Sequence, residues 1–229
     1  KSGVKNGQVM AAELSAIADS DIRVTAITAA MPDGTGLALF KERHPDRFFD
    51  VGIAEEHAVT MAAGLAASGM RPYVAIYSTF LQRAYDQVLV DVCLQKLPVT
   101  FVIDRAGLVG PDGATHQGAY DMAFLRTMPN MVIASPRDVR DLRRLLRLSM
   151  ELDGPMAIRY AQEGDDMGPN MQEPQPLEVG RWELLSAGED VMILAVGRMV
   201  ETALNAAIKL VGKGVRCGVI DARFIKPMD

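Results

Sequence analysis

Short runs of β-branched and aliphatic residues alternate with longer stretches along residues 1–162. Runs of about four to eight apolar residues between polar or turn residues are typical of buried strands. They predict strands at 24–28, 48–52, 73–77, 99–104, 131–134 and 156–159. In the stretches between, apolar residues recur about every 3.6 positions, which predicts helices at 7–18, 36–43, 55–67, 79–95 and 137–151. We therefore expect an α/β domain, a mostly parallel six-stranded sheet with helices on both faces.

The pattern changes after residue 162. Residues 163–180 are rich in glycine, proline and acids and have little apolar periodicity, which predicts a linker. Residues 181–229 form a second unit, with strands predicted at 182–185, 191–196 and 215–220 and a helix at 200–211. One such unit has too little sheet to bury two faces. We expect it to be the truncated beginning of a second α/β domain.

Composition narrows the class of protein. The 229 residues are 49% hydrophobic and 23% charged, with a net charge of −5 and basic residues scattered among acids. This excludes a cationic surface for nucleic acid or an anionic membrane. No apolar run approaches the roughly 18 residues that span a bilayer, and the N-terminus lacks a signal-peptide core, so we expect a cytoplasmic protein. The cysteines and histidines are too dispersed to predict a disulfide framework or a metal site.

Two predicted junctions between a strand and a helix carry polar side chains. DVGIAEEHA, residues 50–58, places Glu55 at the carboxyl end of a strand, where ligands of open α/β sheets bind. Glu55 and Glu56 also suit a helix-dipole role, because both fall in the first helical turn. YSTFLQRAYDQV, residues 77–88, brings an aromatic ring and Arg83 to the same sheet edge. Its Ser78 is equally suited to capping a helix, and Phe80 to filling the core.

A third segment, DRAGLVGPDGATHQG, spans residues 104–118. It carries Arg105, Asp112 and His116 on a glycine-rich backbone, and long loops of this kind are more often functional than decorative. It is not a Walker loop, because no Gly-Lys-Ser/Thr follows. The alternative is a surface loop with a chance histidine.

Together with ITAAM at 27–31, LPVTFVI at 97–103 and DARFIKPMD at 221–229, these three segments resemble the 1-deoxy-D-xylulose-5-phosphate synthases, a family of transketolase-like enzymes. The resemblance covers nearly the whole chain. It implies a pyrimidine-binding domain at 1–162, a linker at 163–180 and the start of a C-terminal transketolase domain at 181–229. The family's diphosphate-binding domain, with its GDG…N element for Mg²⁺, has no counterpart here. We therefore expect a fragment that is inactive alone.

The resemblance implies a reaction and a set of site residues. Pyruvate would condense with glyceraldehyde 3-phosphate, with loss of carbon dioxide, to give 1-deoxy-D-xylulose 5-phosphate, a precursor of isoprenoids, thiamine and pyridoxal. Thiamine diphosphate and Mg²⁺ would be the cofactors, the metal bound mainly by the missing domain, and the enzyme would be a homodimer. Glu55 and His116 match catalytic positions. Met31, Ile53 and Phe80 match the apolar wall around the pyrimidine, whereas substrate would be bound by Tyr77, Arg83, Arg105, Asp112 and Arg159.

One position departs from the family. After Arg159-Tyr160 the family reads Pro-Arg-Gly, and its arginine helps to bind the acceptor phosphate, whereas this chain has Ala161-Gln162-Glu163. A neutral amide cannot replace a guanidinium fork. Either another cation binds the phosphate or the acceptor differs. A transketolase-like paralogue with a different acceptor and a non-catalytic α/β interaction domain are therefore kept as alternatives.

Overall fold

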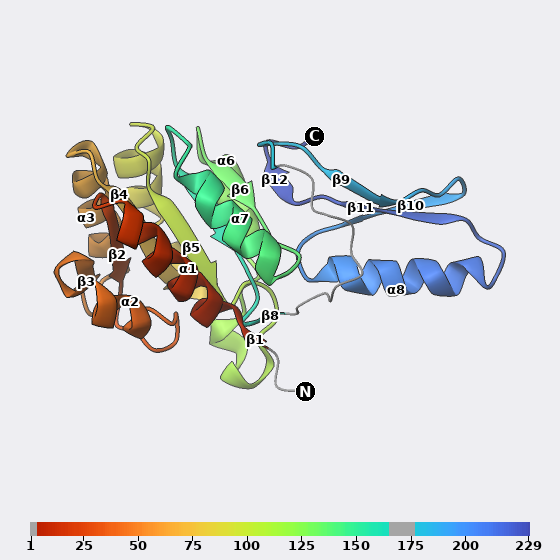
Figure 1. Cartoon of the computed structure of the whole chain (residues 1–229), viewed down its shortest axis with the longest axis horizontal. Coiled ribbons are helices and arrows are strands. Elements are labelled where there is room, and N and C mark those ends of the chain that lie inside the picture. Colours follow the sequence, from red (N-terminus) through yellow and green to blue (C-terminus); the bar gives the residue numbers. More distant parts are fainter. Residues whose placement is uncertain (1–3, 165–176) are drawn as a thin grey trace.

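The computed structural model describes residues 4–164 and 177–229. Its main element is a seven-stranded sheet in the order β12-β6-β7-β5-β4-β2-β3 (Figure 1). Every neighbouring pair is parallel except β12 with β6. The strands are β2 (Val24–Thr28), β3 (Phe48–Asp50), β4 (Arg71–Tyr77), β5 (Thr100–Asp104), β6 (Val132–Ala134), β7 (Met156–Arg159) and β12 (Phe224–Lys226). The six predicted strands and the mostly parallel α/β fold are confirmed.

Helices cover both faces of this sheet because its strands are apolar on both sides. Along β4, Tyr73 and Ala75 belong to one buried cluster, and Val74 and Ile76 to the other, as the period of two in a strand requires. The first face is covered by α1 (Asn6–Ser20), α2 (Ala38–Arg43) and α7 (Val139–Ser149), and the second by α3 (Glu55–Ala67) and α6 (Asp121–Thr127). The short turn η1 (Pro45–Arg47) precedes β3.

The predicted helix at 79–95 is wrong as a single regular helix. The segment contains α4 (Ser78–Leu81), the 3₁₀ turn η2 (Gln82–Ala84), α5 (Tyr85–Gln87) and the π-helical η3 (Val88–Cys93). Its buried positions Val88, Val92 and Cys93 are spaced for a widened turn, and Leu94 N–H donates to the Leu89 carbonyl five residues back. Apolar spacing therefore indicated a helix here without resolving its breaks, and it did not predict α6.

The second unit is a three-stranded sheet in the order β10-β11-β9. It consists of β9 (Glu183–Ser186), β10 (Val191–Ala195) and β11 (Cys217–Asp221), with α8 (Met199–Val211) packed on one face. The prediction of a six-stranded first sheet is wrong by one strand, because β12 leaves this unit and pairs with β6 (Figure 1). Phe224 is fully buried in the first sheet's core, which explains this exchange.

A short strand pair also joins the two ends of the first unit. The strand β1 (Val4–Lys5) pairs antiparallel with β8 (Glu163–Gly164). The predicted linker at 163–180 thus begins with two paired residues, and its positions 165–176 lie outside the described residues. In the part of the chain that is described, no helix has the length and apolar character needed to cross a membrane.

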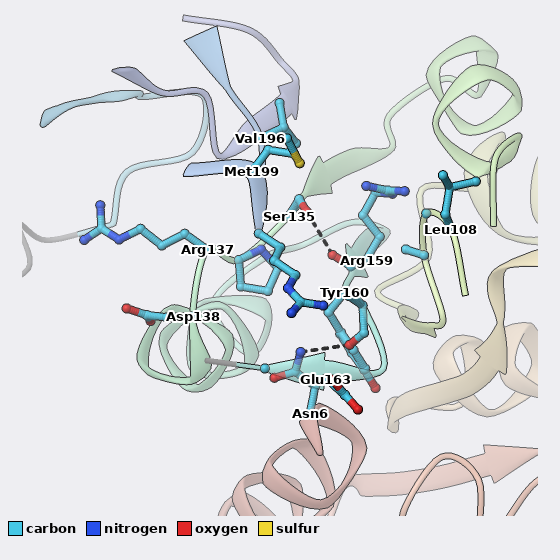
Figure 2. Close-up of a pocket in the computed structure, with 16 residues that line it drawn as sticks. Asn6, Leu108, Ser135, Arg137, Asp138, Arg159, Tyr160, Glu163, Val196 and Met199 are labelled. Atoms are coloured by element: carbon cyan, nitrogen blue, oxygen red, sulfur yellow. Dashed lines mark hydrogen bonds between the residues drawn. The ribbon is translucent and has the colours of Figure 1, made fainter. Parts of the chain in front are cut away.

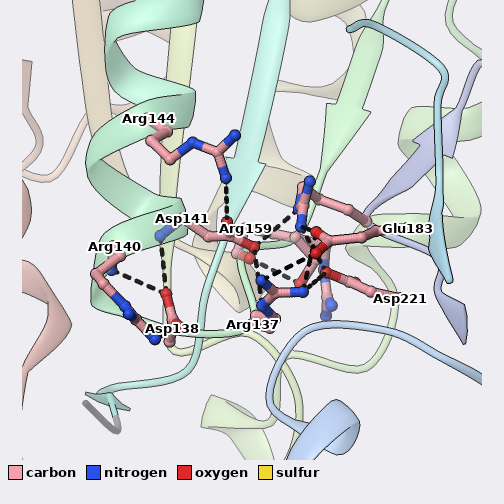
Figure 3. A network of polar contacts seen from close by, with 10 residues as sticks. Arg137, Asp138, Arg140, Asp141, Arg144, Arg159, Glu183 and Asp221 are labelled. Atoms are coloured by element: carbon pink, nitrogen blue, oxygen red, sulfur yellow. Dashed lines mark hydrogen bonds and ion pairs between the residues drawn. The ribbon is translucent and has the colours of Figure 1, made fainter. Parts of the chain in front are cut away.

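A buried ionic network connects the two units (Figure 3). Arg223 Nε donates to Asp141 of α7 at 2.8 Å, and its Nη2 donates to Glu183 of β9 at 2.7 Å and to Asp221 of β11 at 2.8 Å. Arg137 also donates to Glu183, at 3.0 Å. Burial raises the pKa of Asp221 to about 7 even though Arg223 is adjacent. Because each arginine is almost fully enclosed, this network is the main polar connection between the units that the described residues show.

Replacing Arg223 with methionine should destabilise the chain strongly. The variant leaves Asp141, Glu183 and Asp221 enclosed without their main cation, and loss of one partner of a buried pair costs about 3–5 kcal/mol. Urea unfolding monitored by the fluorescence of Trp182, whose indole donates to the Phe224 carbonyl, measures this loss. Arg216→Met is the matched control, because Arg216 pairs with Glu189 and Asp190 at 61% exposure and should contribute less than about 1 kcal/mol. Equal losses in the two variants would contradict a buried network.

Candidate functional site

Four segments meet at the carboxyl ends of the strands of the first sheet. The chain runs from β2 outward to β3 and then returns to place β4 on the other side of β2. In open α/β sheets, ligands bind outside the carboxyl ends of the strands at such a reversal. The segments that follow β2, β3, β4 and β5 therefore converge there, and they carry Met31, Glu55, Phe80 and Arg105.

Glu55 is the first residue of α3 and is only 2% exposed. Arg83 Nη1 donates to its Oε1 at 2.6 Å, while 46% of the Arg83 side chain stays exposed. The Arg83 guanidinium also lies 5.0 Å from the Phe80 ring centroid. Arg83 therefore contacts two of the four side chains that were predicted to bind the cofactor, Glu55 and Phe80, although it was itself predicted to face substrate.

Aromatic rings extend from this pair along the sheet edge. Phe80 stacks on Tyr77, with centroids 5.9 Å apart and an interplanar angle of 21°, and meets the His116 ring edge-on at 5.3 Å. The Arg105 guanidinium lies 3.9 Å from the Tyr77 centroid and forms an ion pair with Asp112. The structure thus brings together Glu55, Phe80, Arg83, Tyr77, His116, Arg105 and Asp112.

The apolar wall predicted for the pyrimidine is divided between core and surface. Met31 is 9% exposed and belongs to the core cluster under α3, whereas Ile53 is 81% exposed at the turn before Glu55. Both lie on segments that approach Glu55. Met31 is thus fixed by packing, and Ile53 is free to meet a ligand or another chain.

The turn after β5 is strained where it presents Arg105. Arg105 has φ of +57°, a left-handed conformation that non-glycine residues rarely adopt. Its N–H donates to Asp104 Oδ1 at 2.5 Å, which stabilises this conformation. Burial raises the pKa of Asp104 to about 7, so its carboxyl is partly neutral near neutral pH. Strain of this kind is concentrated at ligand sites in proteins.

A small cavity of about 90 Å³ lies beside this turn. In one wall the backbone of Gly34 lies against the Tyr77 hydroxyl. Only glycine fits there, because a Cβ on residue 34 would lie 1.6 Å from that hydroxyl. The Arg105 Nε is buried without a hydrogen-bond partner among the described residues. The cavity is lined by Lys5, Gly7, Gln8, Asp33, Gly34, Gly36, Asp104, Arg105 and Gln162. Sequence analysis did not select Lys5, Gln8 or Asp33, because they lie outside the motif segments, and it did not select Asp104, which it treated as the end of a strand.

Arg159 ends β7, next to the β5 strand that leads into the Arg105 turn, but its guanidinium has a different partner. Its Nε donates to Asp121 Oδ2 at 2.7 Å in a buried ion pair. It lines a second cavity, of about 300 Å³, between the first unit and the second, with Ser135, Tyr160 and Met199 among its neighbours (Figure 2). The predicted substrate contact of Arg159 stays a prediction, because Asp121 engages its guanidinium while Ala106, Gly107 and Leu108 of the loop after β5 line the same cavity. In residues 4–164 and 177–229, no three His, Cys, Asp or Glu side chains are grouped to hold a metal ion.

Comparison with known proteins gives the same picture of two units. The family pattern described as the transketolase pyrimidine-binding domain matches residues 2–163, and that of the transketolase C-terminal domain matches residues 180–229. A 1-deoxy-D-xylulose-5-phosphate synthase of Desulforudis audaxviator is 53% identical over 223 residues, 97% of this chain and 35% of that protein. That of Thermomicrobium roseum is 57% identical over 215 residues, 93% of this chain and 34% of that protein. The chain spans about a third of the length of these curated relatives.

Solved structures share the fold. A split-gene transketolase, described as an inactive β4 tetramer, has a TM-score of 0.85 and 30% identity, covering 96% of this chain and 72% of that chain. The transketolase of Campylobacter jejuni has a TM-score of 0.84 at 20% identity, covering 97% of this chain and 36% of that chain. The second unit is included in both alignments, because each covers nearly all of this chain.

The contact between Glu55 and Arg83 should be measurable as a coupling energy. Unfolding free energies of Arg83→Met, Glu55→Gln and the double variant should give a coupling of about 1–2 kcal/mol, the value for a charge-assisted hydrogen bond discounted for the exposure of Arg83. Arg43 and Asp19 offer a control pair, because both side chains are nearly half exposed and their coupling should stay below about 0.5 kcal/mol. If the two cycles give the same value, burial of Glu55 does not strengthen its pairing.

Proposed function

This chain belongs to the transketolase family of pyrimidine-binding domains, and we propose that it supplies the catalytic glutamate and pyrimidine pocket of a 1-deoxy-D-xylulose-5-phosphate synthase. The intact enzyme would condense pyruvate with glyceraldehyde 3-phosphate and release carbon dioxide. The names and 53–57% identity of the relatives support this activity. The observation that carries the proposal is Glu55, an acid buried at the start of α3, at the carboxyl ends of the strands, and connected through Arg83 to the Phe80 ring.

The residues present fit thiamine diphosphate as cofactor. The segments that follow β2, β3 and β4 offer a buried carboxyl group, the Phe80 ring and the apolar side chains of Met31 and Ile53. When bound, the cofactor supplies a nucleophilic carbon that attacks the carbonyl of a keto acid. Glu55 is suited to exchanging a proton with nitrogen N1′ of the pyrimidine, and Phe80 to packing against that ring. Mg²⁺ and the diphosphate would be bound by a separate domain.

Arg83 takes a different role in this proposal from the one expected. Because its guanidinium holds Glu55 Oε1, it orients the carboxyl group, and the second oxygen of Glu55 remains to meet the cofactor. Arg83 is therefore a positioning residue for Glu55 rather than only a contact for substrate.

Substrate would bind on the far side of Phe80. Tyr77 and His116 both contact Phe80, Arg105 lies on the Tyr77 ring, and Asp112 pairs with Arg105. The unpartnered Nε of Arg105 is available to a carboxylate or phosphate oxygen, and His116 can donate or accept a proton. Arg159 is left out of this set, because Asp121 occupies its guanidinium.

We also propose that the intact enzyme is a homodimer. Large apolar side chains are exposed on the turn before α3, at 81% for Ile53, and on and directly after η3, which packs against α3, at 44% for Val90 and 61% for Leu94. Exposed apolar side chains that gather on one region mark protein interfaces, and self-association through a two-fold axis is the commonest solution.

In the intact holoenzyme, Glu55→Gln should lower turnover by about two or more orders of magnitude, because an amide cannot exchange the proton with N1′. Cofactor affinity, measured by titration with thiamine diphosphate, should change far less. Glu56→Gln is the matched control. It removes an exposed carboxylate from the same helical turn and should leave turnover within about two-fold. Similar losses in both variants would favour a helix-dipole effect over catalysis by Glu55.

A second candidate, a paralogue with a different acceptor, is favoured by one observation, the neutral Gln162 in the small cavity beside Arg105. If the acceptor is a phosphorylated aldehyde, Gln162→Arg should lower its KM by about ten-fold to a hundred-fold, the value of a charge-assisted hydrogen bond. KM values for glyceraldehyde 3-phosphate and for unphosphorylated glyceraldehyde provide the comparison. If Gln162→Arg changes the KM values for the two aldehydes equally, or changes neither, position 162 does not face the phosphate.

A further inference from the structure

The small cavity has two cationic side chains in its lining, Lys5 and Arg105. Arg105 forms an ion pair with Asp112 and lies against the Tyr77 ring, so its unpartnered Nε is held in one place and can meet an anion only there. Gln8 and Gln162 in the same lining can also donate hydrogen bonds to an anion, but they carry no charge. Lys5 is exposed, and no ion pair joins it to a carboxylate of the described residues. Its charge is therefore available to a ligand.

The fold fixes Lys5 beside Gln162. Lys5 is paired with Glu163 in the register of β1 with β8. The next residue, Asn6, donates its backbone N–H to the Gln162 carbonyl at 3.1 Å and its side-chain Nδ2 to the Ala161 carbonyl at 2.8 Å. These bonds hold the backbone of Lys5 against residues 161–163. A substitution at 162 and a charge at 5 therefore act on the same cavity, although they are far apart in the sequence.

We propose that Lys5 determines acceptor specificity, by binding the anionic group of a phosphorylated aldehyde where the family has an arginine at the position of Gln162. This inference rests on the proposed function. An ammonium group acts as a point charge on a flexible stem, so it does not need the fixed geometry of a guanidinium fork. It also offsets Asp33, the exposed carboxylate in the same lining, whereas Asp104 is partly neutral near pH 7 and is bonded to the Arg105 N–H.

The test compares two acceptors in the intact holoenzyme. Lys5→Met, which keeps the apolar stem, should raise the KM for glyceraldehyde 3-phosphate by about five- to thirty-fold, less than for a buried charge pair because Lys5 is exposed. The KM values for unphosphorylated glyceraldehyde and for pyruvate should not change. Lys5→Arg should restore the phosphorylated substrate, and Gln162→Arg should compensate for Lys5→Met. Lys213→Met, at an exposed lysine beyond α8, is the control and should change nothing.

An equal effect of Lys5→Met on both aldehydes, or no effect, would overturn the proposal. A readout without turnover separates it from the proposed function. Inorganic phosphate, used as the probe and followed by ³¹P line broadening, should bind the wild-type holoprotein and bind Lys5→Met at least about five-fold more weakly. If neither aldehyde is a substrate of the wild-type enzyme, the proposed function fails, while phosphate broadening still decides the role of Lys5. Equal broadening in both proteins would mean that Lys5 does not bind the anion.

Discussion

Parallel pairing of β2, β4 and β5 is the constraint on which the site depends. Each of these strands is buried on both faces, so the register is set by packing against helices on both sides. Because the strands run in the same direction, their carboxyl ends lie at one edge. Side chains separated by tens of residues, such as Glu55 and Arg83, meet there without any local motif that joins them. A shift of one residue in β4 would turn Tyr77 from the site to the opposite face.

Charge pairing then decides what each side chain at this edge can do. Arg83 meets Glu55, Arg105 meets Asp112, and Arg159 meets Asp121. An arginine whose donors are already used contributes orientation more than affinity for a new anion. The pairs differ in burial, since Arg83 keeps 46% of its side chain exposed and Arg159 keeps 9%. Arg83 is therefore accessible to a ligand, whereas Arg159 is enclosed by its surroundings.

Strands and long regular helices could be predicted from the sequence, because their periodicity follows directly from burial. The start of α3 at Glu55 and the whole of β2 and β7 agree with the prediction to the residue. The breaks within 78–93 could not be predicted, since a π-turn keeps an apolar pattern close to that of an α-helix. The strand β12 was missed for another reason. Three residues carry too little pattern to show that they pair with β6 of another unit.

Prediction of the site had a similar limit. Motifs identified residues on the segments after β3, β4 and β5, and the structure brings most of them together. Arg159 was selected from the same kind of evidence, but its pairing with Asp121 depends on α6, which has no clear signature in the sequence. Lys5 was not selected, because its place beside Gln162 comes from the two-residue pairing of β1 with β8. Sequence motifs therefore cannot predict which side chains meet when the contact depends on short elements that are far apart in the chain.

The first unit carries the residues of the proposed site, and the second unit packs against it without reaching that site. The site lies at the carboxyl ends of β2, β3, β4 and β5. In contrast, β12 is an outermost strand of the sheet, next to β6 and on the side away from β3. The network around Arg223 holds the second unit there through α7, β9 and β11. The second unit places no described side chain against Glu55 or Phe80, yet it closes one wall of the larger cavity next to Arg159. Since Arg159 ends β7 and the Arg105 turn follows the adjacent β5, the larger cavity and the substrate side of the proposed site lie on neighbouring strands.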